Sequence, residues 1–269
     1  MAADIKIPVS VYIITLNEAG KIAALLSQLK IFAEVIVVDC GSSDRTEEIA
    51  KEFANVRFYH RNWSSFSEQK AYALSLCRCE WVLNIDADEE LSDEFITEIR
   101  ATIELNNCDA IQSRRIVYRW GRRAPYFTKD SWLIRFFRKR NGHYEPRRVH
   151  ERISITGTVR RSSAVLIHNQ DMTLDELAIK LNRYSQLKAM DKFENGKRAN
   201  IVILLFIFPL SFIQHYFLKG FFLGGFEGLT GSVNIAFYDF MKYAKLREMQ
   251  HLKQTQAKYF SPATRNGHQ

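Results

Sequence analysis

Trp81-Val82-Leu83-Asn84-Ile85-Asp86-Ala87-Asp88 is the stretch that decides the fold of this 269-residue chain. Its first five residues are almost wholly apolar, as expected for a strand that is covered on both faces. The strand ends in two carboxylates, which makes a site for a hard divalent cation that can be shared with a diphosphate. Alone, the tripeptide is weak evidence, because acidic residues after a strand more often form a solvated turn or begin a helix, as Ser92-Asp93-Glu94 indicates downstream.

Two strand-to-loop units precede this run. An apolar strand over residues 9–14 leads into Thr15-Leu16-Asn17-Glu18, and a second over residues 35–38 leads into Asp39-Cys40-Gly41-Ser42-Ser43-Asp44. A helical pattern follows each loop, with apolar residues spaced three and four apart. Such βαβ units place their loops at the carboxyl ends of parallel strands, where open α/β sheets bind ligands. We therefore expect Asp39, Asp86 and Asp88 to face one crevice.

These loops, together with Gln69-Lys70 and Asp86-Ala87-Asp88-Glu89, resemble glycosyltransferase family 2. The resemblance implies the GT-A nucleotide-diphospho-sugar transferase fold, an α/β fold with a Rossmann-like, mainly parallel sheet. Further stretches are similar to the WaaE/KdtX-like glucosyltransferases of the lipopolysaccharide inner core: Trp63 to Lys70, Arg135-Phe136-Phe137-Arg138, Val149-His150-Glu151, Gly196-Lys197-Arg198 and Lys242 to Leu246. The implied activity is inverting transfer of a hexose, glucose from UDP-glucose, to a heptose of that core.

The resemblance also implies roles for single residues. A nucleotide-sugar pocket would include Thr15, Asn17, Glu18, Asp39, Gly41, Ser42, Lys70 and Asp86. Asp88, with Asp86 beside it, would ligate Mg²⁺ or Mn²⁺ between the donor's two phosphates, where the metal offsets charge on the departing diphosphate. Two plainer interpretations stay open. Residues 42–47 can serve only to cap the next helix, and Lys70, on a predicted helix over residues 66–76, can be a solvated lysine.

Inverting transfer needs a base close to the acceptor hydroxyl. His150-Glu151 supplies the candidate, with Glu151 as base and His150 as a positioning or phosphate-contacting residue. The alternative is that Glu151 only pairs with a neighbouring arginine such as Arg147 or Arg148, since surface pairs of this kind are common. Glu89 and Glu90 are weaker candidates, because a helix N-terminal charge explains them.

Charge is divided unevenly along the chain. The formal net charge is +8, yet residues 1–110 hold 10 Lys/Arg against 19 Asp/Glu, whereas residues 111–161 hold 15 against 3. Aromatic residues are interleaved with these arginines, which suits either nucleic acid or a sugar-phosphate acceptor. The resemblance favours the lipopolysaccharide-core acceptor and no nucleic acid, with Arg135, Arg138, Arg147 and Arg148 as acceptor contacts. A solvated basic face is the alternative for each single arginine.

The remainder of the chain reads as helical, which divides it into a catalytic domain over 1–170, a membrane-associating helical region over 171–250 and a flexible tail over 251–269. The apolar run over residues 201–213 is shorter than the ~20 residues that a membrane span needs. We expect one or two helices lying in the interface, with Lys197, Arg198, Lys219, Lys242 and Lys245 toward anionic headgroups. Packing against the catalytic domain, or dimerisation, remains open.

No signal peptide is evident after Met1, and the four cysteines lack a disulfide-scaffold spacing. The sequence therefore predicts a cytoplasmic protein that is peripherally associated with the inner membrane. A dinucleotide oxidoreductase is disfavoured, because no G-x-G-x-x-G follows the first strand. Two alternatives stay open: a polyprenyl-phosphate glycosyltransferase, and a non-catalytic membrane-surface or nucleic-acid-binding protein that retains the fold.

Overall fold

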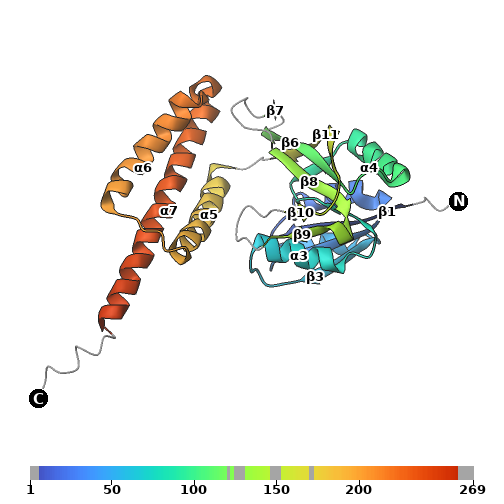
Figure 1. Ribbon diagram of the computed structural model, residues 1–269, viewed down its shortest axis with the longest axis horizontal. Helices are drawn as coiled ribbons and strands as arrows, with labels where there is room; N and C mark the ends of the chain where they lie inside the picture. Colours follow the sequence, from blue (N-terminus) through green and yellow to red (C-terminus); the bar gives the residue numbers. More distant parts are fainter. Residues whose placement is uncertain (1–5, 120–121, 124–130, 146–152, 170–172, 260–269) are drawn as a thin grey trace, which may run out of the picture. The chain divides into compact units, whose positions relative to one another are not determined.

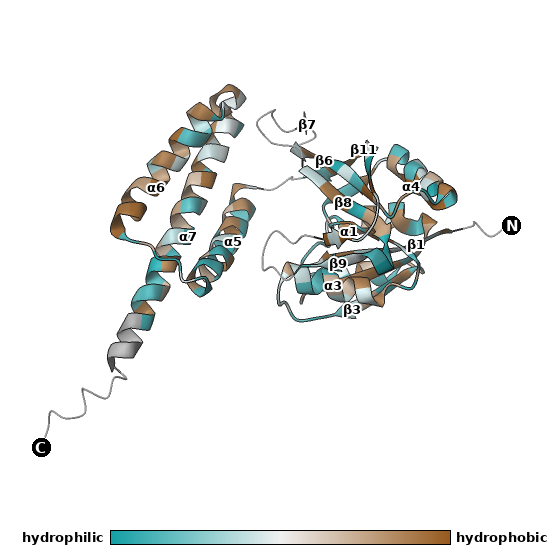
Figure 2. Cartoon of the chain, viewed as in Figure 1, coloured by the Kyte–Doolittle hydropathy of each residue, from teal (hydrophilic) through white to brown (hydrophobic). Residues whose placement is uncertain are grey.

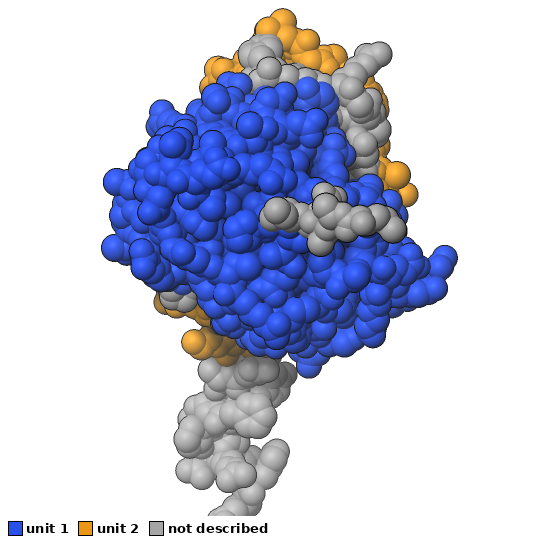
Figure 3. All heavy atoms as spheres, turned by 90° about the vertical axis from the view of Figure 1, so that its right-hand side faces the viewer, with its two compact units in different colours: residues 1–171 blue, residues 172–269 orange. Residues whose placement is uncertain are grey.

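The chain forms two compact units, residues 1–171 and 172–269 (Figure 3). A computed structural model describes residues 6–119, 122–123, 131–145, 153–169 and 173–259.

A nine-stranded mixed sheet is the centre of the first unit (Figure 1). Its strands are β1 (Ile7–Thr15), β2 (Phe32–Asp39), β3 (Val56–His60), β4 (Trp81–Asn84), β5 (Glu89–Leu91), β6 (Ala110–Arg119), β7 (Arg122–Arg123), β8 (Ser131–Arg138) and β11 (Val159–Asn169). They lie in the order β3-β2-β1-β4-β8-β6-β11-β5, with β7 paired to β6. β3, β2, β1 and β4 are parallel, and β8 runs antiparallel between β4 and β6. The predicted α/β fold with a mainly parallel sheet is confirmed.

Strand order explains where a ligand site can form. The chain adds β2 and β3 on one side of β1 and then crosses to add β4 on the other side. Such a reversal of strand order opens a crevice outside the carboxyl ends of the strands. The loops that follow β1, β2 and β4 are therefore the ones placed for binding.

Helices and 3-10 turns complete this unit, and the predicted ones are present. They are α1 (Ile22–Gln28), η1 (Leu29–Ile31), α2 (Thr46–Lys51), α3 (Phe66–Leu76), α4 (Asp93–Leu105) and η2 (Lys139–Asn141), and a separate hairpin pairs β9 (Gly142–Tyr144) with β10 (Ile153–Ile155). Ser65 and Ser92 cap α3 and α4 by accepting hydrogen bonds from Glu68 N and Phe95 N. Ser92 is thus the helix start that the sequence indicated.

The basic segment over residues 111–161 is more buried than its composition predicted. Residues 111–161 were expected to present a basic, acceptor-facing surface, but β6 and β8 lie inside the sheet, between β4 and β11. Ile111, Phe136 and Phe137 are fully buried. Two arginines of β8 are buried as well, since Arg135 is 4% exposed and Arg138 is 7% exposed. High charge in this segment therefore does not mark an exposed surface.

The second unit is helical, with α5 (Leu174–Glu194), α6 (Ile201–Ile213), η3 (Gln214–Leu218), η4 (Phe221–Gly224) and α7 (Gly225–Tyr259). α5 and α6 each pack against α7 (Figure 1). A capping box of Thr173 and Glu176 begins α5. The predicted tail from residue 251 is wrong as far as Tyr259, since α7 continues to that residue. No glycine or proline interrupts residues 232–261, and Pro262 is the next helix breaker.

Helix α6 is also longer than its apolar run indicated. The π-helical turn η3 continues it through Gln214 and His215, so that Ile201–Leu218 forms one 18-residue apolar helix. His215 is accommodated in this apolar helix because its Nδ1 lies within hydrogen-bond distance, 2.8 Å, of the carbonyl oxygen of Ser211. By length and composition this helix can cross a membrane, and only 6% of it is buried.

Candidate functional site

The loops after β1 and β2 are joined by a shared set of hydrogen bonds. Asp39 Oδ2 accepts from the backbone N–H groups of Gly41 and Ser42 at 2.9 and 2.8 Å, and Asp39 Oδ1 accepts from Ser42 Oγ at 2.5 Å. Ser42 Oγ also accepts from Asn17 N, while Asn17 Oδ1 accepts from Ser43 N. Gly41 has φ +100°, which the turn requires and a side chain would disfavour. Asp39 is 1% exposed, so its carboxylate holds this loop in shape.

Strand register brings the predicted residues to one edge of the sheet. Thr15 lies opposite Asp39 between β1 and β2, and Tyr12 lies opposite Asn84 between β1 and β4. Because these three strands are parallel and adjacent, Asp39, Thr15 and the Asp86-Ala87-Asp88 loop follow their carboxyl ends. Thr15 Oγ1 is buried without a hydrogen-bond partner among the described residues. This register agrees with the expectation that the loop carboxylates lie at one edge of the sheet.

Asp86 is clamped between two cationic side chains. Lys70 Nζ, from α3, lies 2.8 Å from Asp86 Oδ1, and Arg135 Nη2, from β8, lies 2.6 Å from Asp86 Oδ2. Burial raises the pKa of a carboxylate, but here Arg135 and Lys70 hold the pKa of Asp86 well below its usual range. Both oxygens are thus occupied by cations, which fits a role in positioning the loop better than the predicted role as a metal ligand.

Arg135 links this pair to a second buried carboxylate. Its guanidinium also donates to Glu89 Oε1 at 2.5 Å and to Asn84 Oδ1 at 2.7 Å. Glu89, on β5, is 1% exposed, and burial raises its pKa although Arg135 opposes the shift. Arg135 is itself 4% exposed. It therefore lies beneath the loop, and its predicted contact with the acceptor does not fit this position.

Arg138 is also misplaced by the sequence prediction. It lies opposite Trp81, at the start of β4, which is the end of the sheet away from Asp86. Its guanidinium contacts Glu80 and Asn106 and lies 4.2 Å from the centre of the Trp81 ring. Arg135 and Arg138 lie three positions apart on β8. Arg135 is therefore beside Asp86, whereas Arg138 lies beside the start of β4. This position does not favour the predicted acceptor contact at Arg138.

Asp88 has a different neighbour from Asp86. The Nδ1 atom of His168, on β11, lies 3.3 Å from Asp88 Oδ1. The His168 side chain is 6% exposed and that of Asp88 is 23% exposed, so the carboxylate reaches the surface while the imidazole is buried behind it. A carboxylate oxygen and an imidazole nitrogen are donors that suit Mn²⁺. Within the described part of the chain, no cluster of three or more His, Cys, Asp or Glu side chains forms a metal site. Asp88 therefore fits the role of a metal ligand, and His168 is placed to orient its carboxylate.

The predicted catalytic base cannot be compared with this geometry, since His150, Glu151, Arg147 and Arg148 lie outside the described residues. The strands on either side of that segment are described. β9 and β10 pair antiparallel, with Tyr144 opposite Ile153. Tyr144 Oη lies 2.5 Å from the hydroxyl of Tyr12, on β1. The hairpin is thus anchored beside the strand that carries Thr15.

Sequence reasoning missed His168 and Asn84, and it explained Glu89 only as a helix N-terminal charge. His168 ends the apolar run Ala164-Val165-Leu166-Ile167, the same arrangement of a polar residue after a buried strand that drew attention to Asp86. That signal was available. The role of Glu89 could not be predicted from the sequence, because it depends on the antiparallel pairing of β5 with β11. This pairing brings Glu89 opposite His168.

Known proteins resemble this chain over most of its length. The Glycosyl transferase family 2 profile matches residues 10–165. A lipopolysaccharide core biosynthesis glycosyltransferase of Rhizobium meliloti, LpsC, is 32% identical over 263 residues, which cover 92% of this chain and 95% of that protein. An uncharacterized glycosyltransferase of Rickettsia prowazekii is 31% identical over 90% of this chain and 87% of its own length. The structure of S. aureus TarS 1–349 in complex with UDP-GlcNAc is 14% identical with a TM-score of 0.50, covering 90% of this chain and 93% of that one.

Proposed function

Because the chain belongs to glycosyltransferase family 2, we propose that it transfers a hexose, glucose from UDP-glucose, to a heptose of the lipopolysaccharide inner core, with inversion at the transferred carbon. One observation carries the proposal. Asp39, Thr15 and the Asp86-Ala87-Asp88 loop follow the carboxyl ends of three adjacent parallel strands, and Asp88 reaches the surface beside His168. This is the edge at which an open α/β sheet binds a nucleotide.

The donor would lie across the loops after β1 and β2. Their backbone is fixed by Asp39, Asn17 and Ser42 before any ligand arrives, so little conformational entropy is lost when the nucleotide binds. Lys70 and Arg135 hold Asp86 and place two positive charges under the same loop. Because these pairs fix the loop before the diphosphate binds, little reorganisation is needed when negative charge develops as the bond to the sugar breaks.

Asp88 would hold Mg²⁺ or Mn²⁺, with His168 behind it. When bound, such an ion neutralises charge on the two phosphates of the donor. Asp88 brings the negative charge, and His168 orients the carboxylate through its ring nitrogen.

Glu151 would accept the proton of the acceptor hydroxyl as the new bond forms, with His150 beside it. The acceptor would come from the side of the β9–β10 hairpin, which carries the segment containing Glu151 between Tyr144 and Ile153. Arg147 and Arg148, in the same segment, would bind its phosphate groups through bidentate hydrogen bonds. An acceptor of this class is synthesised at the inner membrane, so the enzyme would act at the cytoplasmic face of that membrane.

A panel of donors and acceptors tests the proposal. Purified protein is supplied with UDP-, GDP- and ADP-sugars and Mn²⁺, and with either heptose-containing core acceptors or polyprenyl phosphate. We expect transfer from UDP-glucose to the core acceptor, and none after Asp88→Asn. Transfer only to polyprenyl phosphate would replace the acceptor assignment. Absence of transfer and of UDP-sugar hydrolysis from every donor, together with tight binding of RNA or DNA, would favour the non-catalytic alternative.

A further inference from the structure

The helical unit carries a hairpin whose outer surface is apolar. We define the apolar hairpin as residues 201–237. α6 and η3 form its first arm, η4 forms the turn, and the first part of α7 forms the second arm. Large apolar side chains are exposed along both arms and at the turn, among them Leu205, Leu210, Leu218, Leu223, Leu229 and Phe237. Leu218 is 80% exposed. Figure 2 shows α6 coloured as hydrophobic over most of its length. Water is a poor solvent for a surface of this kind.

Several polar side chains of the hairpin are bonded within the helical unit. Ser211 Oγ donates to Asp239 Oδ2 at 2.6 Å, between the two arms, and Lys242 Nζ lies 2.5 Å from Asp239 Oδ1, so the carboxylate at the level of Leu210 is neutralised by an ion pair. Ser232 and Thr230 donate to the carbonyl oxygens of Gly228 and Phe226, one turn earlier in α7. This internal pairing is what a hydrocarbon environment demands, because lipid offers no hydrogen bonds. A surface built for a protein partner normally presents polar groups at its rim.

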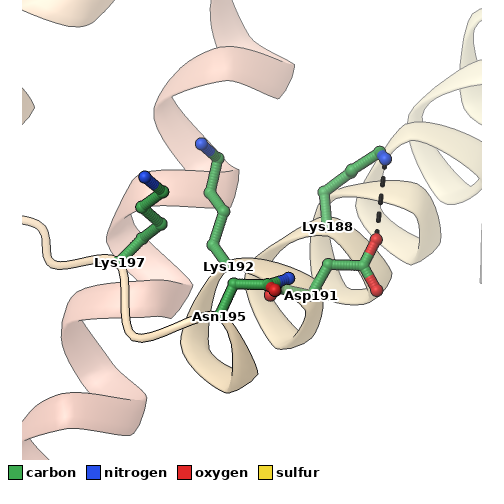
Figure 4. A pocket seen from close by; sticks show the side chains of 5 residues that line it. All are labelled: Lys188, Asp191, Lys192, Asn195 and Lys197. Atoms are coloured by element: carbon green, nitrogen blue, oxygen red, sulfur yellow. Dashed lines mark hydrogen bonds and ion pairs between the residues drawn. The ribbon is translucent and has the colours of Figure 1, made fainter.

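Positive charge collects at the opposite end, which we call the base. Residues 201–238 contain only two charged residues, Lys219 and Glu227, both close to the turn. At the base, three lysines line a hollow of about 500 Å³ with an aspartate and an asparagine: Lys188, Asp191, Lys192, Asn195 and Lys197 (Figure 4). The Nζ atom of Lys192 lies 4.7 Å from the centre of the Tyr243 ring on α7. Basic residues at this position match the anionic phosphates of a bilayer surface.

The base is held together as one body. Gln250 Nε2 donates to the carbonyl oxygen of Lys197, and Lys245 Nζ donates to Asn182 on α5. Ala189, Ala199 and Leu246 form a small buried core between these segments. The apolar hairpin can therefore enter a membrane while α5 and the base stay in water.

We propose that the apolar hairpin inserts turn-first through the acyl layer of an anionic bilayer, with the base at the headgroups of the entry side. The 18-residue helix Ile201–Leu218 is about 27 Å long at ~1.5 Å per residue, close to the ~30 Å of a hydrocarbon core. Lys219 and Glu227 then reach the headgroups of the far side. This attachment is deeper than the peripheral one that the sequence predicted. It refines the proposed action at the inner membrane but does not depend on the donor or the acceptor.

Aspartate substitutions at different depths test the insertion. The full chain is mixed with vesicles of equal parts phosphatidylcholine and phosphatidylglycerol and floated on a density gradient. Leu210 lies midway along the first arm, so Leu210→Asp should weaken vesicle binding about 100-fold, the cost of a carboxylate at mid-bilayer. Leu218→Asp, near the far headgroups, should cost less than about tenfold. Leu105→Asp on α4, which is 68% exposed, is the matched control and should bind as the unchanged protein does.

Each outcome is decisive. Binding that survives a high-salt wash and follows the depth pattern supports insertion. Equal effects of Leu210→Asp and Leu218→Asp, or release by salt, would show that the hairpin lies on the surface and would overturn the proposal. The proposal would also be overturned if the protein did not bind vesicles and instead formed an oligomer that dissociates on Leu210→Asp. Transfer to a soluble core acceptor, measured in detergent, should be unaffected by Leu210→Asp, so this proposal and the proposed function can fail separately.

Discussion

Lys70 and Asp86 form an ion pair, with 2.8 Å between Nζ and Oδ1 and a lysine side chain that is only 2% exposed. The two residues come from different elements, α3 and the loop after β4. Their pairing fixes the loop that also carries Asp88, and Arg135 fixes it from the other side. Charges that hold a loop of this kind reduce the reorganisation needed when a phosphate group binds.

Lys70→Met should therefore reduce both stability and activity. Removing one partner of a buried pair leaves an uncompensated charge, but Asp86 keeps Arg135 and partial access to solvent. We expect a loss of about 1–3 kcal/mol in the free energy of unfolding and a fall of tenfold or more in kcat/KM for the donor. Denaturant titration and initial rates measure the two effects. Lys51→Met, which breaks the exposed pair of Lys51 with Glu47, should change stability by less than ~0.5 kcal/mol. Equal midpoints for the two variants would contradict the role of Lys70.

Glu34 should make the stability of the fold depend on pH. Burial raises the pKa of this side chain, but hydrogen bonds from Ser10, from the backbone of Arg78 and from Arg57 hold the pKa below its ordinary value. A lowered pKa in the folded state means that the stabilisation is present above the unfolded pKa of about 4.3 and is lost as pH falls through the folded value. The difference in Tm between the unchanged protein and Glu34→Gln should therefore be largest near pH 7 and shrink toward about pH 3.

A thermal-shift series across this range measures the effect. Glu48→Gln removes an exposed pair with Arg45 and serves as the control, with little change in Tm at any pH. A difference between the unchanged protein and Glu34→Gln that stays constant with pH would show that the network of Glu34 acts by packing rather than by charge.

The sequence predicted those elements of the fold that depend on short-range patterns of apolar and capping residues. The strand over residues 35–38, the helices α3 and α6 and the cap at Ser92 follow from apolar periodicity and capping chemistry, and each is present. The convergence of Asp39 with the Asp86 loop followed from the rule that parallel strands present their loops at one edge.

The pairing of strands that lie far apart in the sequence could not be predicted from these local patterns. The burial of Arg135 depends on β8 being inserted antiparallel between β4 and β6, and the neighbour of Asp88 depends on β11 closing the far side of the sheet. Arginine is rarely buried, so a segment rich in arginine was read as a surface. In this protein its charge is balanced by Asp86 and Glu89, two carboxylates that the sequence places about 45 to 50 residues away.

Removal of divalent metal should stop transfer, and His168 should set the affinity for the ion. EDTA is expected to abolish activity, and added Mn²⁺ to restore it. Because His168 Nδ1 lies 3.3 Å from Asp88 Oδ1, His168→Ala should raise the Mn²⁺ concentration for half-maximal activity about 10- to 100-fold. A direct readout is the paramagnetic resonance signal of free Mn²⁺ titrated with protein and UDP. His143→Ala, at an exposed position on β9, is the control and should leave the titration unchanged. Full activity in EDTA would end the metal assignment.

Glu151→Gln should separate the chemical step from donor binding. A general base contributes about 10²- to 10⁴-fold to the rate, so kcat should fall within that range while KM for the donor changes little, because the donor is held by the loops after β1, β2 and β4. The amide keeps the size of the side chain, so a loss of kcat reports the missing base. Glu90→Gln offers a matched carboxylate on β5 that is exposed, and its kcat should remain that of the unchanged enzyme. If Glu151→Gln kept its full rate and Glu90→Gln lost it, the base would lie on β5, and the segment between β9 and β10 would serve acceptor binding alone.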